Sequence, residues 1–286
     1  MRSFEYLRPT RIEEAVQFLG ANPEDTLVIA GGTAAVVLLH LGVLRPRYVL
    51  DIGAIADLRE WSSGDSLRLG ALTSIRSIER DHAIAHDYGV LSDAASQVAN
   101  VRVRNVATLG GTIAYGEPQT DTPVALTSLN AMIEVAGAQG RRQVPIDDFF
   151  LGPYETTLEA GELVTAVTIP KPLPGTVGHH LKFTVGSPEN KPIANVSTAI
   201  LLDSAGKCLE AKIVLGAVGP TPVIASAAAG LLGETPSAGL IKDVAATAAE
   251  ETDPIEDIRG PVWYKRRISR VLVERALKCV LQKTQA

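Results

Sequence analysis

Residues 106–123, VATLGGTIAYGEPQTDTP, constrain the fold most because they suit few ordinary structural settings. They hold no basic residue and no apolar run long enough to predict an ordinary helix. A diglycine stands between Thr108 and Thr112, and Asp121 follows among prolines. Paired glycines let a backbone approach a ligand with successive N–H groups aimed at one point, and threonines add hydroxyl donors. The stretch indicates an uncharged phosphate loop; two consecutive turns are the other interpretation.

A second Gly-Gly-Thr motif lies near the start of the chain. Residues 27–29 predict a buried strand, the diglycine occupies positions 31–32, and the apolar run 35–41 predicts a helix. A strand, a glycine turn and a helix leave free N–H groups at a helix N-terminus, where an anion is favoured. Two such motifs fit a ligand with two phosphates, a dinucleotide. Neither motif has the spacing of a Rossmann or P-loop fingerprint.

Composition narrows the class of protein further. A net charge of −5 argues against a nucleic-acid binder, and no apolar run is long enough to predict a transmembrane helix. Cys208 and Cys279 stand far apart, which predicts a reducing compartment and no cysteine-ligated cluster or zinc site in this chain. Among the five histidines, only His82 and His86 stand four residues apart, and a solvated helix face is favoured there over a metal site. Because residues 1–5 contain no apolar leader, we expect a cytoplasmic protein.

The two motifs resemble those of a known family, the FAD-binding medium subunits of the molybdenum hydroxylases (carbon monoxide dehydrogenase and xanthine dehydrogenase type). The family's first loop, A-G-G-[TH]-x-[LV], corresponds to residues 30–36. Its second, [TS]-[VIL]-G-G-N-[IL]-A-x-x-x-P-x-x-D-x-x-P, corresponds to 108–121 with the last proline displaced. Thr112 stands where the family usually has asparagine, and residues 186–190 also depart from its pattern.

The resemblance covers nearly the whole chain and implies an α+β fold. It predicts a two-subdomain FAD-binding domain of the vanillyl-alcohol-oxidase (PCMH) type, followed by a C-terminal α+β domain of the CO dehydrogenase flavoprotein type. Apolar periodicity and the proline-rich linker 171–175 place an N-terminal α/β subdomain at 1–54 and a second at 55–174, and the resemblance implies that both are FAD subdomains. The C-terminal domain then spans 175–286.

The resemblance also implies which residues bind FAD. The two motifs would hold the pyrophosphate, and they comprise Leu27, Val28, Ile29, Ala30, Gly31, Gly32, Thr33 and Ala34, then Thr108, Leu109, Gly110, Gly111 and Thr112. Asp121 would bind a ribose hydroxyl, a role compatible with capping a helix. Val98, Val164 and Lys182 would border the isoalloxazine ring. The alternatives are plain core for Val164 and a surface position for Lys182.

The implied function is electron transfer within a larger enzyme. An FAD subunit of this type takes electrons from the [2Fe-2S] clusters of a small partner, which receives them from a large molybdopterin subunit. It passes them to NAD, a quinone, oxygen or another acceptor, and the expected assembly is a dimer of heterotrimers. Substrate chemistry would lie on another chain, so no catalytic residue is expected here. A flavin-free scaffold subunit and a stand-alone flavin oxidoreductase are the alternatives.

Overall fold

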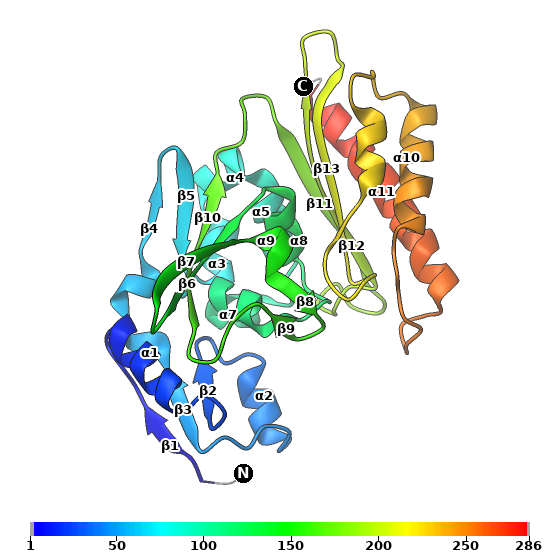
Figure 1. Cartoon of the computed structure of the whole chain (residues 1–286). Helices are drawn as coiled ribbons and strands as arrows, with labels where there is room; N and C mark the ends of the chain where they lie inside the picture. The colour runs from blue at the N-terminus through cyan, green and yellow to red at the C-terminus, as the bar shows by residue number, and fades with distance from the viewer. Residues whose placement is uncertain (1–2, 285–286) are drawn as a thin grey trace.

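A computed structural model describes residues 3–284. Met1 and Arg2, which belong to the stretch 1–5 where we expected no apolar leader, and the last two residues lie outside the described range. Figure 1 shows three units that follow one another along the chain, each built on its own β-sheet. The three sheets lie within residues 5–51, 61–170 and 177–224. We retain the predicted boundaries at 54/55 and 174/175 as a proposal.

The N-terminal unit is a small parallel sheet with two helices. Its strands run in the order β1-β3-β2, and both neighbouring pairs are parallel. Its elements are β1 (Glu5–Leu7), α1 (Ile12–Ala21), β2 (Thr26–Ile29), α2 (Ala35–His40) and β3 (Tyr48–Asp51). The expected buried strand, β2, is instead a half-buried edge strand, because only β3 pairs with it. In a parallel sheet the carboxyl ends of all strands lie at one edge. The first diglycine follows the carboxyl end of β2 and therefore lies at that edge.

The second unit is a five-stranded antiparallel sheet with helices packed around it. The strand order is β4-β5-β10-β6-β7. Its strands are β4 (Trp61–Ser63), β5 (Ser66–Gly70), β6 (Met132–Gly137), β7 (Gly140–Pro145) and β10 (Leu163–Pro170). The helices between them are α3 (Ile75–Arg80), α4 (His82–Asp87), α5 (Gly89–Ser96), α6 (Val101–Val106), α7 (Leu109–Tyr115), α8 (Thr122–Ser128) and α9 (Ile146–Phe149). A short hairpin joins β8 (Phe150–Gly152) to β9 (Glu155–Thr156).

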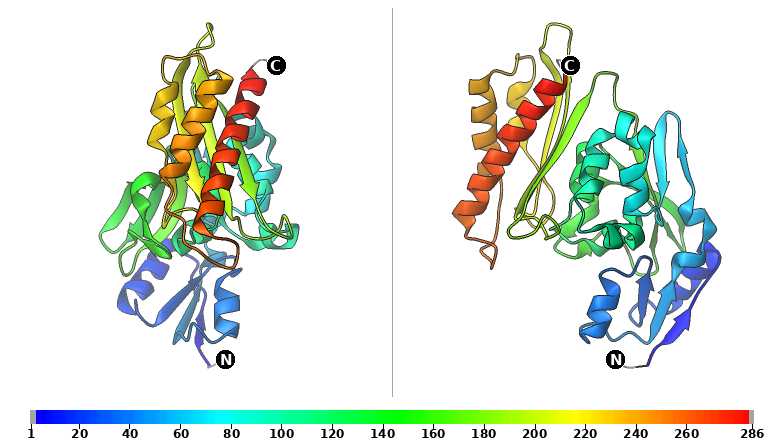
Figure 2. Two further views of the ribbon diagram at one scale, coloured as in Figure 1. Left: turned by 90° about the vertical axis from the view of Figure 1, so that its right-hand side faces the viewer. Right: turned by 180° about the vertical axis from the view of Figure 1, so that it is seen from behind.

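The C-terminal unit is an antiparallel sheet between two layers of helices. Its strands are β11 (Val177–Phe183), β12 (Ala194–Leu202), β13 (Cys208–Gly216) and β14 (Val223–Ile224), paired in that order. The helices α10 (Ala238–Glu250) and α11 (Val262–Thr284) cover its outer face, as both views in Figure 2 show. Helices α5 and α8 of the second unit contact its strands from the other side. The chain's middle therefore lies against this sheet.

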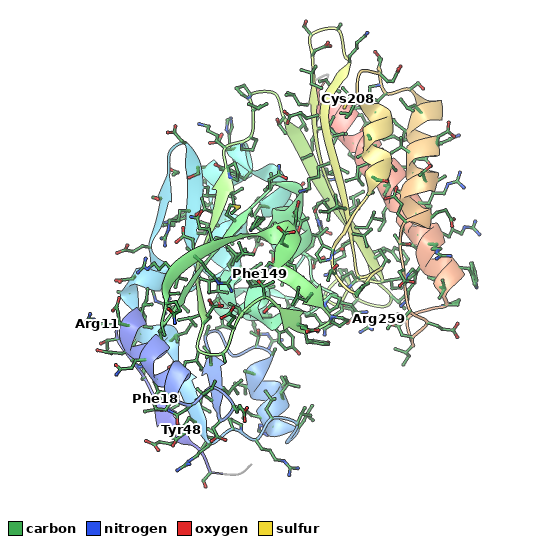
Figure 3. The ribbon with its side chains drawn as sticks, in the orientation of Figure 1. Arg11, Phe18, Tyr48, Phe149, Cys208 and Arg259 are labelled. Carbon is green, nitrogen blue, oxygen red and sulfur yellow. The ribbon has the colours of Figure 1, made fainter. Side chains whose placement is uncertain are left out.

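Two hydrophobic cores hold these units together. One runs through both N-terminal units, from Ile12 to Ile169, and includes Phe149, whose side chain is fully buried (Figure 3). The other lies between the C-terminal sheet and its two helices. At the edge of the molecule Phe18 of α1 packs edge-on against Tyr48 of β3, with ring centroids 5.2 Å apart. The shared core makes the first two units parts of one domain.

Candidate cofactor site

The first diglycine motif forms an open turn of backbone N–H groups. Gly32 has a φ of +70°, a conformation that glycine adopts without strain. Within residues 3–284, the N–H groups of residues 31–34 make no backbone or side-chain hydrogen bond. The first bond after them runs from Val36 N to Gly32 O at 3.0 Å. Because α2 has only six residues, the four N–H groups rather than a helix dipole would attract an anion.

The second diglycine motif is not the loop that the sequence predicted but the first turn of α7. Thr108 caps this helix, and its Oγ1 accepts a hydrogen bond from Gly111 N at 3.2 Å. A helix forms despite two glycines because its apolar side, Leu109 and Ile113, is fully buried. Gly110 is required by packing, since a Cβ there would lie 2.4 Å from the Cβ of Ala71.

The structure brings the two motifs into contact. A Cβ at Gly31 would lie 1.9 Å from the carbonyl oxygen of Val106, just before the second motif. A Cβ at Gly111 would lie 3.9 Å from the Cβ of Ala30. Gly31 is therefore needed for backbone contact between motifs that stand far apart in sequence. The two motifs therefore lie side by side, as they must if they bind the same ligand.

Asp121 and Lys182 form a second group, between the second unit and the C-terminal sheet. Lys182 Nζ donates to Asp121 Oδ2 at 2.9 Å and to Gln97 O at 2.8 Å. Asn195 Nδ2 donates to Asp121 Oδ1 at 2.8 Å, and His180 Nε2 lies 3.4 Å from the same oxygen. Both charged side chains are only 4% exposed, which rules out the alternative of a surface position for Lys182.

The electrostatics of this group favour an ionised carboxylate. Burial acts to raise the pKa of Asp121, but the hydrogen bond from His180, the nearby positive charges and the Asn195 amide outweigh it. The pKa of Asp121 therefore lies below its usual value. His180 Nδ1 also contacts Ser197 Oγ at 2.8 Å, which completes a buried polar network.

Sequence reasoning missed four members of this network. They are Gln97, His180, Asn195 and Ser197, and the last three are fully buried. One signal was present, since Asn195 and Ser197 alternate on the apolar strand β12 and so share a face. Gln97 carried no such signal; its backbone carbonyl accepts from Lys182, and its side-chain Nε2 donates to His180 O at 3.2 Å.

The remaining predicted residues flank these two groups. Val98 follows Gln97, is half-buried and packs against the main core. Val164 is 3% exposed on β10, beside a register shift in its pairing with β6. Such bulges re-aim side chains. The β10 strand also contacts α7, and Ala71 N bonds to Thr165 O at 2.9 Å, which places Val164 near the second motif.

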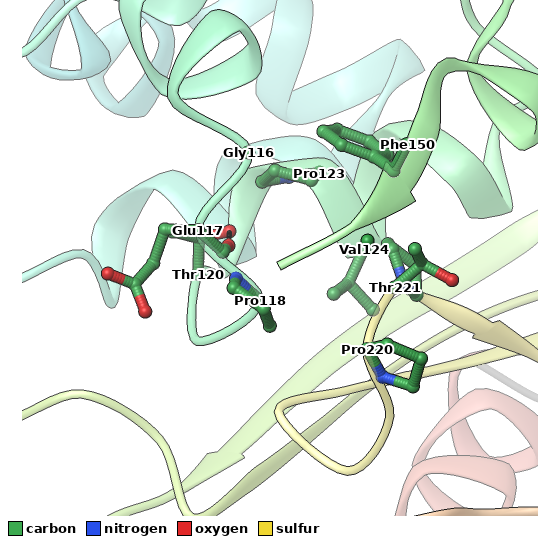
Figure 4. A pocket seen from close by; sticks show the side chains of 11 residues that line it. Gly116, Glu117, Pro118, Thr120, Pro123, Val124, Phe150, Pro220 and Thr221 are labelled. Carbon is green, nitrogen blue, oxygen red and sulfur yellow. Dashed lines mark hydrogen bonds between the residues drawn. The ribbon is translucent and has the colours of Figure 1, made fainter. Parts of the chain in front are cut away.

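A separate small pocket lies close to Asp121 in sequence but has different chemistry. Figure 4 shows it between the segment 116–124, Phe150 and the turn 220–222. Its lining includes four prolines, Pro118, Pro123, Pro220 and Pro222. Proline has no N–H donor, and none of the lining residues belongs to the diglycine motifs. The pocket is therefore not the phosphate site.

Comparison with known proteins decides the family. The model for the FAD-binding domain in molybdopterin dehydrogenase matches residues 2–172, more than half of the chain. This chain belongs to that family. The C-terminal domain of CO dehydrogenase flavoproteins matches residues 187–280. These matches confirm three predictions: the family that the chain resembles, the α+β fold class and the assignment as an FAD-binding oxidoreductase subunit.

Individual family members resemble the chain over nearly its full length. The glyceraldehyde dehydrogenase medium chain of Sulfolobus acidocaldarius is 33% identical and covers 96% of this chain and 97% of its own. The carbon monoxide dehydrogenase medium chain of Afipia carboxidovorans is 32% identical, with 96% of each chain covered. A solved carbon monoxide dehydrogenase from Hydrogenophaga pseudoflava superposes with a TM-score of 0.95 at 31% identity, covering 98% of both chains. No helix within residues 3–284 has the length and apolarity to span a membrane.

Proposed function

We propose that this family member carries electrons through a multi-subunit molybdenum hydroxylase or dehydrogenase. Electrons would arrive from the [2Fe-2S] clusters of a small partner, which is fed by a large molybdopterin subunit. They would leave to an external acceptor, from a dimer of heterotrimers in the cytoplasm. FAD, when bound, supplies the ability to accept and release these electrons. This chain's residues hold the cofactor and set the charge around it.

The observation that carries the proposal is the set of unpaired N–H groups at residues 31–34, next to the second motif. Buried or half-buried N–H groups without partners are costly unless a ligand or water satisfies them. No Asp or Glu lies between Asp25 and Asp51, so no nearby acidic side chain in this stretch repels a phosphate. We assign these four groups to the pyrophosphate of FAD.

The second motif contributes differently in this proposal. The N–H groups of residues 109–112 are all bonded within the protein. Thr112 Oγ1 donates its proton to Thr108 O at 3.0 Å. Among the residues that the structure describes, Thr108 Oγ1 only accepts, from Gly111 N, and so keeps its own proton for a phosphate oxygen. Gly111, which is exposed, keeps the surface beside it free of a side chain.

Lys182 and Asp121 would contact the ring and ribose parts of the cofactor. An ammonium group has three N–H donors, and two of those on Lys182 are used by Asp121 and Gln97. The third is left for the isoalloxazine edge, which Val98 and Val164 would border. A carboxylate offers about four lone-pair positions. Three protein donors approach those of Asp121, which leaves one for a ribose hydroxyl.

The absorption spectrum of the purified chain, with and without added FAD, tests the proposal. We expect the visible bands of oxidised flavin to stay with the protein through gel filtration, or to appear after FAD is added. A chain that neither carries nor takes up flavin, alone or with its partner subunits, would instead support the scaffold alternative.

A glycine variant tests the assignment of the site. Gly111→Asp puts a carboxylate at the proposed phosphate position, and we expect it to abolish FAD binding. Gly64→Asp is the matched control, because nothing lies within 4 Å of a Cβ at that position. If Gly111→Asp folds and binds FAD as tightly as the control, the second motif does not form part of the site.

A further inference from the structure

The carboxylate of Asp121 is held by the C-terminal sheet and not by the helix that it precedes. Asp121 stands just before α8, where an aspartate ordinarily accepts a hydrogen bond from an N–H group of its own helix, yet its side chain makes no such bond. Within residues 3–284 its side-chain partners are Lys182 and His180 of β11 and Asn195 of β12. The C-terminal sheet therefore orients a carboxylate that belongs to the second unit.

Asn195 is fully buried, and its side-chain amide binds two groups at the start of α8. Its Nδ2 donates to Thr120 O and to Asp121 Oδ1, both at 2.8 Å. These bonds determine which way the amide points, because the reverse orientation would turn the amide oxygen toward the carboxylate. Lys182 Nζ binds the other carboxylate oxygen, Oδ2, at 2.9 Å. Asn195 thus fixes the carboxylate, and the carboxylate fixes the ammonium group.

This orientation leaves the amide oxygen of Asn195 without a partner. Among the residues that the structure describes, Asn195 Oδ1 is buried and makes no hydrogen bond. Such an acceptor lowers stability, so packing alone would favour an apolar residue here. Gly216 is the strand partner of Asn195 and gives the amide room, since a Cβ there would lie 2.2 Å from Oδ1. A polar residue retained against stability indicates a role in function.

We propose that Asn195 is a positioning residue for the cofactor site and acts on Lys182 through Asp121. The inference rests on the proposed function, in which Lys182 contacts the isoalloxazine ring. Lys182 Nζ is confined between Asp121 Oδ2 at 2.9 Å and Gln97 O at 2.8 Å, so its third N–H has one direction. A cation held still beside the ring stabilises the negatively charged reduced flavin more than the neutral oxidised form. Asn195 thereby raises the reduction potential of the flavin, although both of its own amide protons are used within the protein.

The test is the reduction potential of FAD bound to Asn195 variants, measured at one pH and compared with that of free FAD. The difference gives the ratio of the affinities for reduced and oxidised flavin. Asn195→Leu keeps the forked shape of the side chain without its donors, and Asn195→Ala removes the same donors without crowding. In both, the ratio should fall about 10-fold, which is about 30 mV for a two-electron couple.

Thr198→Val is the matched control. Thr198 is fully buried on the same strand, and its hydroxyl donates to His179 O at 3.3 Å instead of to Asp121. The substitution removes one buried hydrogen bond of β12, and because successive residues of a strand face opposite sides, it leaves the side that carries Asn195 intact. The affinity ratio should therefore stay at its wild-type value.

A double variant tests whether Asn195 acts through Lys182. Lys182→Gln keeps two N–H donors but removes the positive charge. Adding Asn195→Leu to it should lower the affinity ratio no further, because the charge that Asn195 positions is gone. An additive fall in the double variant, an equal fall in the Thr198→Val control, or an unchanged ratio in both Asn195 variants overturns the inference and leaves the proposed function intact. A wild-type chain that takes up no flavin, alone or with its partner subunits, rejects the proposed function itself.

Discussion

The two Gly-Gly-Thr motifs have the same residues but opposite hydrogen-bonding states. At the first, the N–H groups of residues 31–34 have no partner within residues 3–284. At the second, Leu109 N bonds to Thr73 O at 2.9 Å and Gly110 N to Ala71 O at 2.8 Å. The first motif is therefore open to a ligand, whereas the second is already bonded to the protein. A glycine pair identifies a close approach, but the approaching group can be a ligand or another segment of backbone.

The largest effect on stability is expected at Asp121, in the segment that follows the second motif. Asp121→Asn should lower the free energy of unfolding by about 3–5 kcal/mol, because it leaves the buried Lys182 ammonium without its counter-charge. Urea unfolding at neutral pH measures this loss. The double variant with Lys182→Met should recover part of it. A single variant as stable as wild type would show that the pair is not a structural element.

The pH dependence of the same variant sharpens that prediction. The pKa of Asp121 is lower in the folded chain than its ordinary value. Its contribution is therefore complete above the unfolded-state pKa and is lost as pH falls through the folded-state pKa. The stability difference between wild type and Asp121→Asn should shrink in that acidic range. A difference that stays constant down to complete protonation would contradict this cause.

Gly110→Ala probes whether the second motif is a packing contact. Its Cβ would lie 2.4 Å from the Cβ of Ala71 and 2.8 Å from its Cα, so backbone must move. We expect a loss of about 1–3 kcal/mol in the free energy of unfolding, measured without FAD. Gly89→Ala, at the first position of α5, is the matched control, because its φ is not positive and its Cβ meets no atom within 4 Å. If Gly110→Ala were as stable as wild type, close packing would not be the reason for glycine in the second motif.

The two threonines give the smallest effects and the sharpest contrast. Thr108→Val removes the cap of Gly111 N and should cost about 1 kcal/mol of stability, and it also removes the hydroxyl assigned to a phosphate oxygen, so FAD binding should weaken as well. Thr33→Val, at an exposed turn position, should change stability by less than about 0.5 kcal/mol. It should weaken FAD binding about 10-fold, as loss of a hydrogen bond to a charged group does. Denaturant unfolding and FAD titration of both variants measure the pair. If Thr33→Val lost stability and Thr108→Val did not, the roles assigned to the two motifs would be exchanged.

The sequence predicted local features better than distant contacts. The strand predicted at 27–29 and the helix predicted at 35–41 from apolar periodicity appear as β2 and α2. The helical form of the second motif was missed because glycine disfavours helix, and burial of Leu109 and Ile113 overrides that preference. The partners of Asp121 stand 59 to 74 residues away, where no local pattern reports them. Only the family resemblance singled out Lys182.

Hydrogen–deuterium exchange of the chain with and without FAD tests the central claim most directly. Unpaired N–H groups exchange quickly and slow when a ligand binds them, whereas bonded groups are protected already. We predict that residues 31–34 exchange rapidly without FAD and become protected with it, while residues 109–112 are protected in both states. Protection gained at 109–112, with no change at 31–34, would contradict the account.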